Sequence, residues 1–122
     1  AASDVYKRQI YVGRNNRQND ELTFRLARKD DIWCHASKVH GSHVIISCGG
    51  TTPPDDTVTQ AAQLAAYYAE TGGGQNIPVD VTAVKQVKKI PNGKPGMVIY
   101  TTYQTAVVTP DAALCERLKE KE

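Results

Sequence analysis

The order and composition of the predicted elements indicate an α+β domain built on a largely antiparallel sheet. Strand-like and helix-like segments do not alternate regularly along the 122 residues, as they would in a parallel α/β fold. One alanine-rich stretch has apolar residues at helical spacing, while most other apolar runs have the length of strands. Two pairs of strand-like runs are joined by short turn-forming links, which favours antiparallel pairing. We therefore expect one sheet packed by one long alanine-rich helix, with short helices near both termini.

Length and composition indicate a single domain. A chain of 122 residues buries one modest core but is too short to divide into two. Residues 1–9 carry little pattern and are assigned no fold role, so residues 10–122 are predicted to form the domain. Three cysteines without close pairing are typical of a reduced, cytosolic protein. The sequence has neither an apolar run of 18 residues nor a visible signal peptide, so no membrane association is expected.

The segment before residue 30 is predicted to form one strand and one short helix. The strand is expected at residues 10–12, where it ends at a glycine. Asn19 or Asp20 is expected to cap a helix that runs to Arg28. Acidic residues in its first turn and basic residues in its last turn suit the helix dipole.

A hairpin of strands at residues 31–36 and 43–47 is the centre of the prediction. A short, mostly polar link that contains a glycine joins the two runs. Because successive side chains on a strand point to opposite faces, one face of the hairpin collects small apolar residues. The other face collects an indole, two imidazoles and a carboxylate, from Asp31, Trp33, His35 and His43. This asymmetry is the most function-like feature of the sequence, although a lone tryptophan is more typical of a core.

The second half is predicted to contain the long helix, three strands and a last helix. Glycine-rich residues 71–76 are expected to form a flexible link, and residues 91–96 a turn. The elements expected are a helix capped by Asp55, Asp56 or Thr57 that reaches Tyr68, a strand at 79–84, a hairpin of 97–101 with 105–108, and a helix from 112 to about 119 with a fraying tail.

Positive charge is unevenly distributed, although the formal net charge is only +2. Residues 7–29 contain seven basic residues and two acids, and residues 81–109 contain four lysines and no acid. Such a bias suits a surface that meets a polyanion. The same bias is typical of a lysine-rich face that is merely solvated.

Metal, catalytic and cofactor sites are weakly supported. His35, His40, His43 and Cys34 show no recognised zinc spacing, and strand alternation separates the thiol from its neighbouring imidazole. Ser42 beside His43 lacks the Gly-x-Ser-x-Gly turn of a nucleophile. Residues 93–96 lack the Gly-Lys-Ser/Thr ending of a phosphate loop. We therefore predict no catalytic residue, no metal and no cofactor.

Binding to RNA is the remaining function that these side chains suit. Arginine, lysine and asparagine side chains contact phosphates, while aromatic rings and imidazoles stack on or hydrogen-bond unpaired bases. Trp33 and His35 are predicted either to stack on RNA or to lie in the core. The predicted RNA contacts are Arg14, Asn15, Asn16, Asn19, Lys38, Ser42, His43, Lys85, Lys88, Lys89 and Lys94.

Several short motifs occur in a fixed order along the chain. They include Val12-Gly13-Arg14-Asn15-Asn16, Asp31-Ile32-Trp33, Gly41-Ser42-His43-Val44-Ile45 and Lys94-Pro95-Gly96-Met97-Val98. Together they resemble the NFACT-R domain, which also occurs in proteins labelled fibronectin-binding protein A. The similarity covers nearly everything from Ile10 onward. It departs from the family at Cys34, where a bulky apolar residue is usual, and at His40, where a proline is usual.

The resemblance implies a non-enzymatic, RNA-binding C-terminal module of the RqcH and NEMF family of ribosome-associated quality-control factors. Those cytoplasmic proteins bind large ribosomal subunits blocked by peptidyl-tRNA and recruit tRNA. The stalled chain then gains an untemplated tail, which in bacteria is rich in alanine. The implied partners are tRNA, the RNA of the large ribosomal subunit and the other domains of the full-length NFACT protein.

Two other functions remain open at this point. One is a protein-interaction or adhesin-type module, as the fibronectin label suggests. The other is a nuclease-like enzyme that would use Asp31, His35 and His43.

Overall fold

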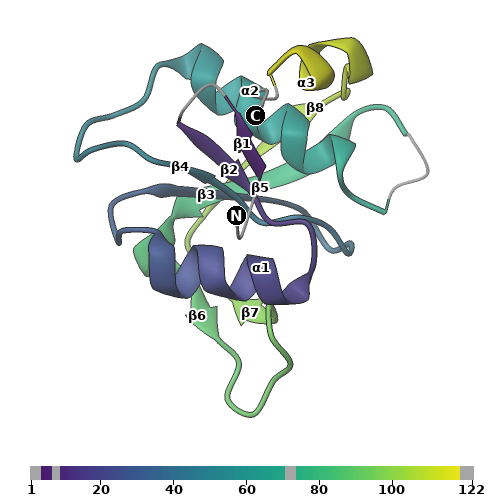
Figure 1. Cartoon of the computed structure of the whole chain (residues 1–122). Helices are drawn as coiled ribbons and strands as arrows, with labels where there is room; N and C mark the ends of the chain where they lie inside the picture. Colours follow the sequence, from purple (N-terminus) through teal and green to yellow (C-terminus); the bar gives the residue numbers. More distant parts are fainter. Residues whose placement is uncertain (1–3, 7–8, 71–73, 119–122) are drawn as a thin grey trace.

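Six antiparallel strands form the central sheet of the computed structural model, in the order β1-β2-β4-β3-β5-β8 (Figure 1). The predicted α+β class with a largely antiparallel sheet is confirmed. The strands are β1 (Asp4–Tyr6), β2 (Ile10–Val12), β3 (Ile32–Ala36), β4 (Val44–Ile46), β5 (Ile77–Ala83) and β8 (Gln104–Val108).

The structure describes residues 4–6, 9–70 and 74–118. Strand β1 pairs with β2, so the prediction that residues 1–9 have no fold role is wrong for residues 4–6. The first three residues of the predicted flexible link, and the end of the predicted C-terminal tail, lie outside the described residues. Within the described ranges no helix combines the length and the apolar character needed to cross a bilayer.

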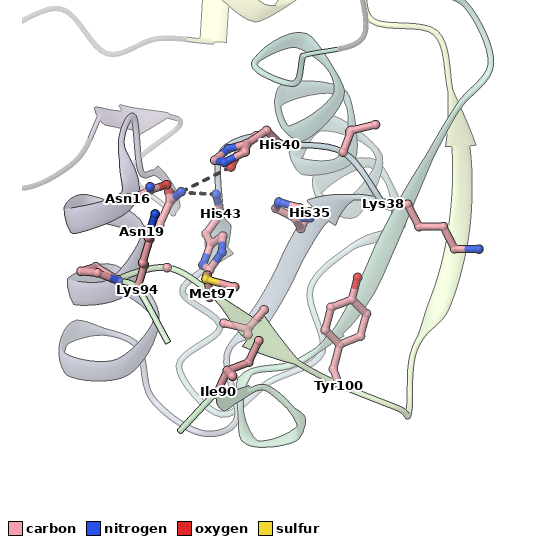
Figure 2. A pocket seen from close by; sticks show the side chains of 15 residues that line it. Asn16, Asn19, His35, Lys38, His40, His43, Ile90, Lys94, Met97 and Tyr100 are labelled. Atoms are coloured by element: carbon pink, nitrogen blue, oxygen red, sulfur yellow. Dashed lines mark hydrogen bonds between the residues drawn. The ribbon is translucent and has the colours of Figure 1, made fainter. Parts of the chain in front are cut away.

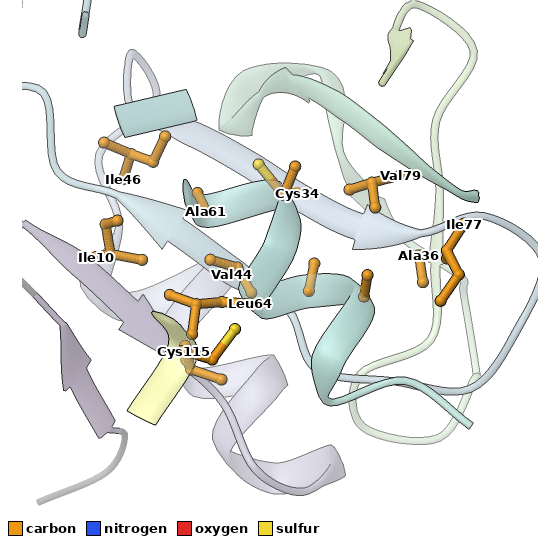
Figure 3. Packing of buried hydrophobic residues seen from close by; sticks show 14 residues of the cluster. Ile10, Cys34, Ala36, Val44, Ile46, Ala61, Leu64, Ile77, Val79 and Cys115 are labelled. Atoms are coloured by element: carbon orange, nitrogen blue, oxygen red, sulfur yellow. The ribbon is translucent and has the colours of Figure 1, made fainter. Parts of the chain in front are cut away.

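The long helix α2 (Asp55–Tyr67) covers one face of the sheet, as predicted (Figures 1 and 3). Its buried alanines lie against apolar side chains of β2, β3, β4 and β5, and their small size permits close packing. The short helix α3 (Ala112–Leu118) packs beside α2 and buries Cys115 in the same core. The N-cap of α2 is Pro54, without a side-chain hydrogen bond. The expected caps Asp55 and Asp56 instead lie in the first turn, where their charges suit the helix dipole.

A second, smaller core lies on the opposite face of the sheet, beneath helix α1 (Asn16–Glu21) and the π-helical turn that continues it, η1 (Leu22–Leu26). It contains Leu22, Trp33, Ile45, Val84 and Val87. The helix begins earlier than predicted, because Asn15 is its N-cap and accepts a hydrogen bond from the Gln18 amide (2.9 Å). Asn19 and Asp20 are therefore inside the helix, and the predicted caps are wrong.

The predicted hairpin of residues 97–101 with 105–108 is wrong. Strand β7 (Val98–Ile99) pairs with β6 (Lys88–Lys89) in a separate two-stranded sheet. β8 pairs instead with β5 at the edge of the main sheet, where Ala106 lies opposite Val79. The turn-forming residues 91–96 close the smaller hairpin, and the 3₁₀ turn η2 (Val84–Gln86) leads into it from β5. Two adjacent lysines gave β6 no strand signal, so its pairing could not be recognised from sequence.

The close approach of α2 to the sheet predicts that enlarging one of its buried alanines destabilises the fold. Ala61 is fully buried, and a leucine there must displace core atoms. We expect Ala61→Leu to lower the free energy of unfolding by about 1–3 kcal/mol, measured by urea denaturation. Thr59→Leu places the same side chain on an exposed position of the same helix and should change stability little. Equal stabilities for the two variants would contradict close packing.

Candidate nucleic-acid interface

The β3–β4 hairpin separates its side chains between two faces as the sequence predicts. Cys34, Val44 and Ile46 lie in the core beneath α2. Trp33, His35 and His43 lie on the other face, where the two imidazole rings meet at 89° with centroids 5.4 Å apart. The asymmetry inferred from strand alternation is therefore confirmed.

Trp33 belongs to the core and forms the base of an aromatic cluster. Its side chain is fully buried, so the alternative in which it stacks directly on RNA is wrong. The ring lies nearly parallel to His35, with centroids 5.5 Å apart and 14° between planes. It meets His43 and Tyr100 edge-on, at 5.2 Å and 4.8 Å. Trp33 thus supports three side chains that line the cleft described next.

A cleft of about 530 Å³ opens above this cluster (Figure 2). It lies between the start of α1, the link from β3 to β4, and the β6–β7 hairpin with its turn. All three histidines of the chain line it, together with Asn16, Lys38 and Lys94. Among the described residues, no aspartate or glutamate lines the cleft. Figure 2 shows Lys94 on the α1 side and Lys38 on the other side.

Asn19 holds the link between β3 and β4 against α1. Its Oδ1 accepts a hydrogen bond from the His43 amide (3.0 Å), and its Nδ2 donates to the Gly41 carbonyl (3.3 Å) (Figure 2). Gly13 leaves room for this arrangement, because a Cβ there would lie 2.2 Å from Asn19 Oδ1. Asn19 is 4% exposed, so its observed role is structural: it fixes the link between β3 and β4, which forms one wall of the cleft.

His43 is a buried, neutral imidazole. It is 2% exposed, and its Nδ1 lies 2.8 Å from Thr23 Oγ1. Burial, with a smaller effect of neighbouring His35, lowers the pKa of His43 to about 3. Burial also lowers the pKa of His35, although the nearby Asp80 carboxylate opposes the shift. Both rings therefore act as uncharged hydrogen-bonding groups at neutral pH.

The β6–β7 hairpin is attached to α1 through Asp20. Lys89 Nζ lies 3.0 Å from the Asp20 carboxylate, and the Gly96 amide donates to the same group (3.3 Å). Burial acts to raise the pKa of Asp20, but the bonds from Lys89 and Gly96 outweigh it and the pKa is lowered. Gly96 has a φ of +83°, and a Cβ there would lie 3.1 Å from the Asn16 carbonyl oxygen. Lys89 therefore ties to α1 the hairpin whose turn lines the cleft.

The other predicted contacts are distributed around this cleft. Lys38 and Lys94 are exposed at its rim, and Asn16 is exposed beside them. Arg14 lies 4.0 Å over the Tyr68 ring, in an adjoining hollow that Asn15 and the buried Ser42 also line. Lys85 and Lys88 are exposed but do not line either hollow.

Tyr100 and Asp80 are functional candidates that the sequence reasoning did not single out. The Tyr100 hydroxyl donates to Asp80 Oδ2 (2.5 Å), and Thr105 Oγ1 donates to Oδ1 (3.0 Å). Burial, and then the Asp80 carboxylate, raise the pKa of Tyr100. Asp80 is 3% exposed and lies between Val79 and Val81 in β5. An acid between two valines was the available signal, because a buried carboxylate needs partners.

The three residues named for a nuclease do not converge on one site. The Asp31 carboxylate accepts hydrogen bonds from the Arg28 amide (2.8 Å) and the Cys48 amide (3.0 Å). It borders a different hollow from the one that His35 and His43 line. Within the described part of the chain, no three His, Cys, Asp or Glu side chains group in a way that could hold a metal ion.

Comparison with known proteins gives a family match and close relatives. Residues 3–101 match the family model described as NFACT protein RNA binding domain. The chain is 48% identical over 111 residues to a Streptococcus pneumoniae (serotype 2, strain D39) protein named Rqc2 homolog RqcH. It is 46% identical over 112 residues to the protein of the same name from Bacillus subtilis (strain 168). Each alignment covers 91% of this chain, but only 20% and 19% of the two relatives.

A solved structure has the same fold. It is the C-terminal part of the fibronectin/fibrinogen-binding protein from Streptococcus suis, with a TM-score of 0.87 and 41% sequence identity. The match covers 91% of this chain and 44% of that chain. This chain therefore spans about a fifth of the curated relatives' length and less than half of the solved one.

The space that Gly13 leaves for Asn19 predicts a specific effect of adding a methyl group. We expect Gly13→Ala to destabilise the protein by about 1–3 kcal/mol through overpacking. Because Asn19 must move, the His43 amide should also exchange its hydrogen faster, as measured by NMR. Arg17→Ala, at an exposed position of α1, the helix that contains Asn19, should leave that exchange rate unchanged. Unaltered exchange in Gly13→Ala would contradict the role given to Asn19.

The depressed pKa of His43 predicts a loss of stability in mild acid. The unfolded state binds a proton near pH 6.5, whereas the folded state does so only near pH 3. Stability from this group is therefore complete above pH 6.5 and falls by up to about 1.4 kcal/mol per pH unit below it. Urea denaturation at pH 7 and 5 should show a smaller loss in His43→Asn than in the wild type. His40→Asn, at an exposed position, should retain the wild-type loss, and equal losses in all three would contradict the assignment.

Proposed function

The chain belongs to the family of NFACT protein RNA-binding domains, and we propose on this basis that its cleft binds tRNA, large-subunit ribosomal RNA, or both. The observation that carries this proposal is a cleft with lysines on two sides and no carboxylate among its described lining residues. Phosphates are contacted mainly by lysine, arginine and amide side chains. Lys38, Lys94 and Asn16 supply such groups at the rim.

Arg14 extends the same surface beyond the cleft. Its guanidinium lies over Tyr68 in the adjoining hollow, where it adds positive charge that attracts a polyanion. Nine of the eleven contacts predicted from sequence fall into two roles in this proposal, and Lys85 and Lys88, which line neither hollow, are assigned to neither role. Arg14, Asn16, Lys38 and Lys94 contact RNA, while Asn15, Asn19, Ser42, His43 and Lys89 shape the surface that presents them.

We place this domain in a larger ribosome-associated quality-control factor that acts in the cytoplasm. The support is the identity to relatives named Rqc2 homolog RqcH, of which this chain spans about a fifth. In this proposal the domain contributes RNA contacts on obstructed large subunits during alanine tailing of stalled chains. The other domains of the full-length protein supply the remaining functions, and no catalytic step is assigned to this domain.

The rim lysines should control the strength and the salt dependence of RNA binding. We expect Lys38→Ala with Lys94→Ala to weaken binding by about 1 kcal/mol per lysine, or roughly fivefold each. The slope of log K against log salt should become shallower by about 0.7–0.9 for each phosphate that the variant no longer neutralises. Fluorescence anisotropy with labelled tRNA and ribosomal RNA fragments at several salt concentrations measures both quantities.

Lys29→Ala with Lys85→Ala is the matched control. It removes the same charge at the other end of β3, where the Lys85 amide donates to the Lys29 carbonyl (3.0 Å). This control should keep the wild-type slope. If the slope of log K against log salt became shallower in the control but stayed at the wild-type value in the cleft variant, the RNA would bind near Lys29 and Lys85 and not at the cleft. Binding that survives high salt and nuclease treatment of a cell extract would instead favour a protein partner.

A further inference from the structure

We propose that the cleft receives one unpaired nucleotide of the bound RNA, with its base against His35 and its flanking phosphates at Lys38 and Lys94. This inference rests on the proposed RNA-binding function and specifies the form of RNA that the cleft accepts. It is carried by the shape of the cleft, by its aromatic floor and by the position of its charges.

The size and walls of the cleft suit a single base with its sugar. Its volume of about 530 Å³ lies within the range of about 300–1,000 Å³ typical of small-molecule sites. Val39, Ile90, Met97 and Val98 provide apolar surface on its sides. A base within a duplex is covered by its neighbours and by its pairing partner, so only an unpaired or extruded base can enter such a site.

The floor of the cleft offers a stacking surface. One face of the His35 ring is covered by Trp33 at a nearly parallel angle, while His35 itself is only half-buried and lines the cleft. In this proposal the base stacks on the face of His35 that is turned away from Trp33, and it continues the stack that begins at Trp33. Stacking of this kind accepts any base, because every base has a π-face.

The distribution of charge matches a nucleotide inside a strand. Burial lowers the pKa of both His35 and His43, so the centre of the cleft is uncharged at neutral pH. The two lysines lie on different sides of this centre (Figure 2). An RNA strand has the complementary arrangement, since each uncharged base lies between two phosphates. A mononucleotide or a free phosphate would leave one lysine without a partner.

The exposed amide of Asn16 adds a polar contact beside this neutral centre. An amide offers both a donor and an acceptor, so it can bond to the edge of any of the four bases. The cleft should therefore distinguish unpaired from paired RNA more strongly than it distinguishes one sequence from another.

Trp33 provides a direct readout of cleft occupancy. It is the only tryptophan of the chain, and it contacts His35, His43 and Tyr100, which all line the cleft.

The experiment titrates the protein with a hairpin RNA carrying an unpaired loop, and with a fully paired duplex of equal length and charge. Anisotropy of the labelled RNA gives the affinity, and tryptophan fluorescence reports on the cleft.

We expect the hairpin to bind at least tenfold more tightly than the duplex and to change Trp33 fluorescence, with no change for the duplex. His35→Ala should abolish the preference, while His35→Phe should retain it because phenylalanine keeps the stacking surface. Circular dichroism and the fluorescence of the free proteins establish that both variants fold. The wild-type comparison does not depend on either variant.

The remaining outcomes distinguish this inference from the proposed function. Equal affinity for hairpin and duplex, or hairpin binding that leaves Trp33 fluorescence unchanged, overturns the nucleotide site while RNA binding stands. Loss of the hairpin preference in both His35 variants also overturns the stacking role. Absence of binding to either RNA overturns both proposals.

Discussion

The contact between Asn19 and the backbone at the start of β4 is the constraint on which the rest of the site depends. One amide side chain accepts a hydrogen bond from the His43 N–H and donates to the Gly41 carbonyl. It thereby fixes the link from β3 to β4 against α1. Because both groups are buried or partly buried, an alternative that left them without partners would cost free energy. The absence of a side chain at Gly13 is what permits this approach.

The same packing separates uncharged from charged groups in the cleft. The aromatic cluster around Trp33 holds the imidazoles of His35 and His43 in a desolvated environment, where burial disfavours their protonated forms. Lys38 and Lys94, in contrast, extend from exposed turns at the rim. Positive charge is thus confined to the edge of the cleft, so an anionic polymer can be held at the edge while an uncharged group occupies the middle.

Side-chain alternation was sufficient to predict the two faces of the β3–β4 hairpin, because strand periodicity is a local property. The pairing of β8 with β5 was not predictable in that way, since register between distant segments depends on which faces the whole sheet buries. The cap of α1 was misplaced for a related reason. Asn15 and Asn19 are equally good caps by residue type, and only the tertiary bonds of Asn19 show that its side chain is used elsewhere.

The lysines of residues 85–94 show why a run of charge does not define an interface. In the sequence they form one basic segment without an acid, but the fold assigns them different roles. Lys89 is paired with Asp20, which comes from a distant part of the chain, and Lys94 lies at the rim of the cleft. Lys85 and Lys88 border neither hollow beside α1. Asp20, which is distant in sequence but near in space, pairs with Lys89 and so separates its role from that of Lys94. Composition therefore identifies a candidate surface, and only the fold identifies which side chains can contact a ligand there.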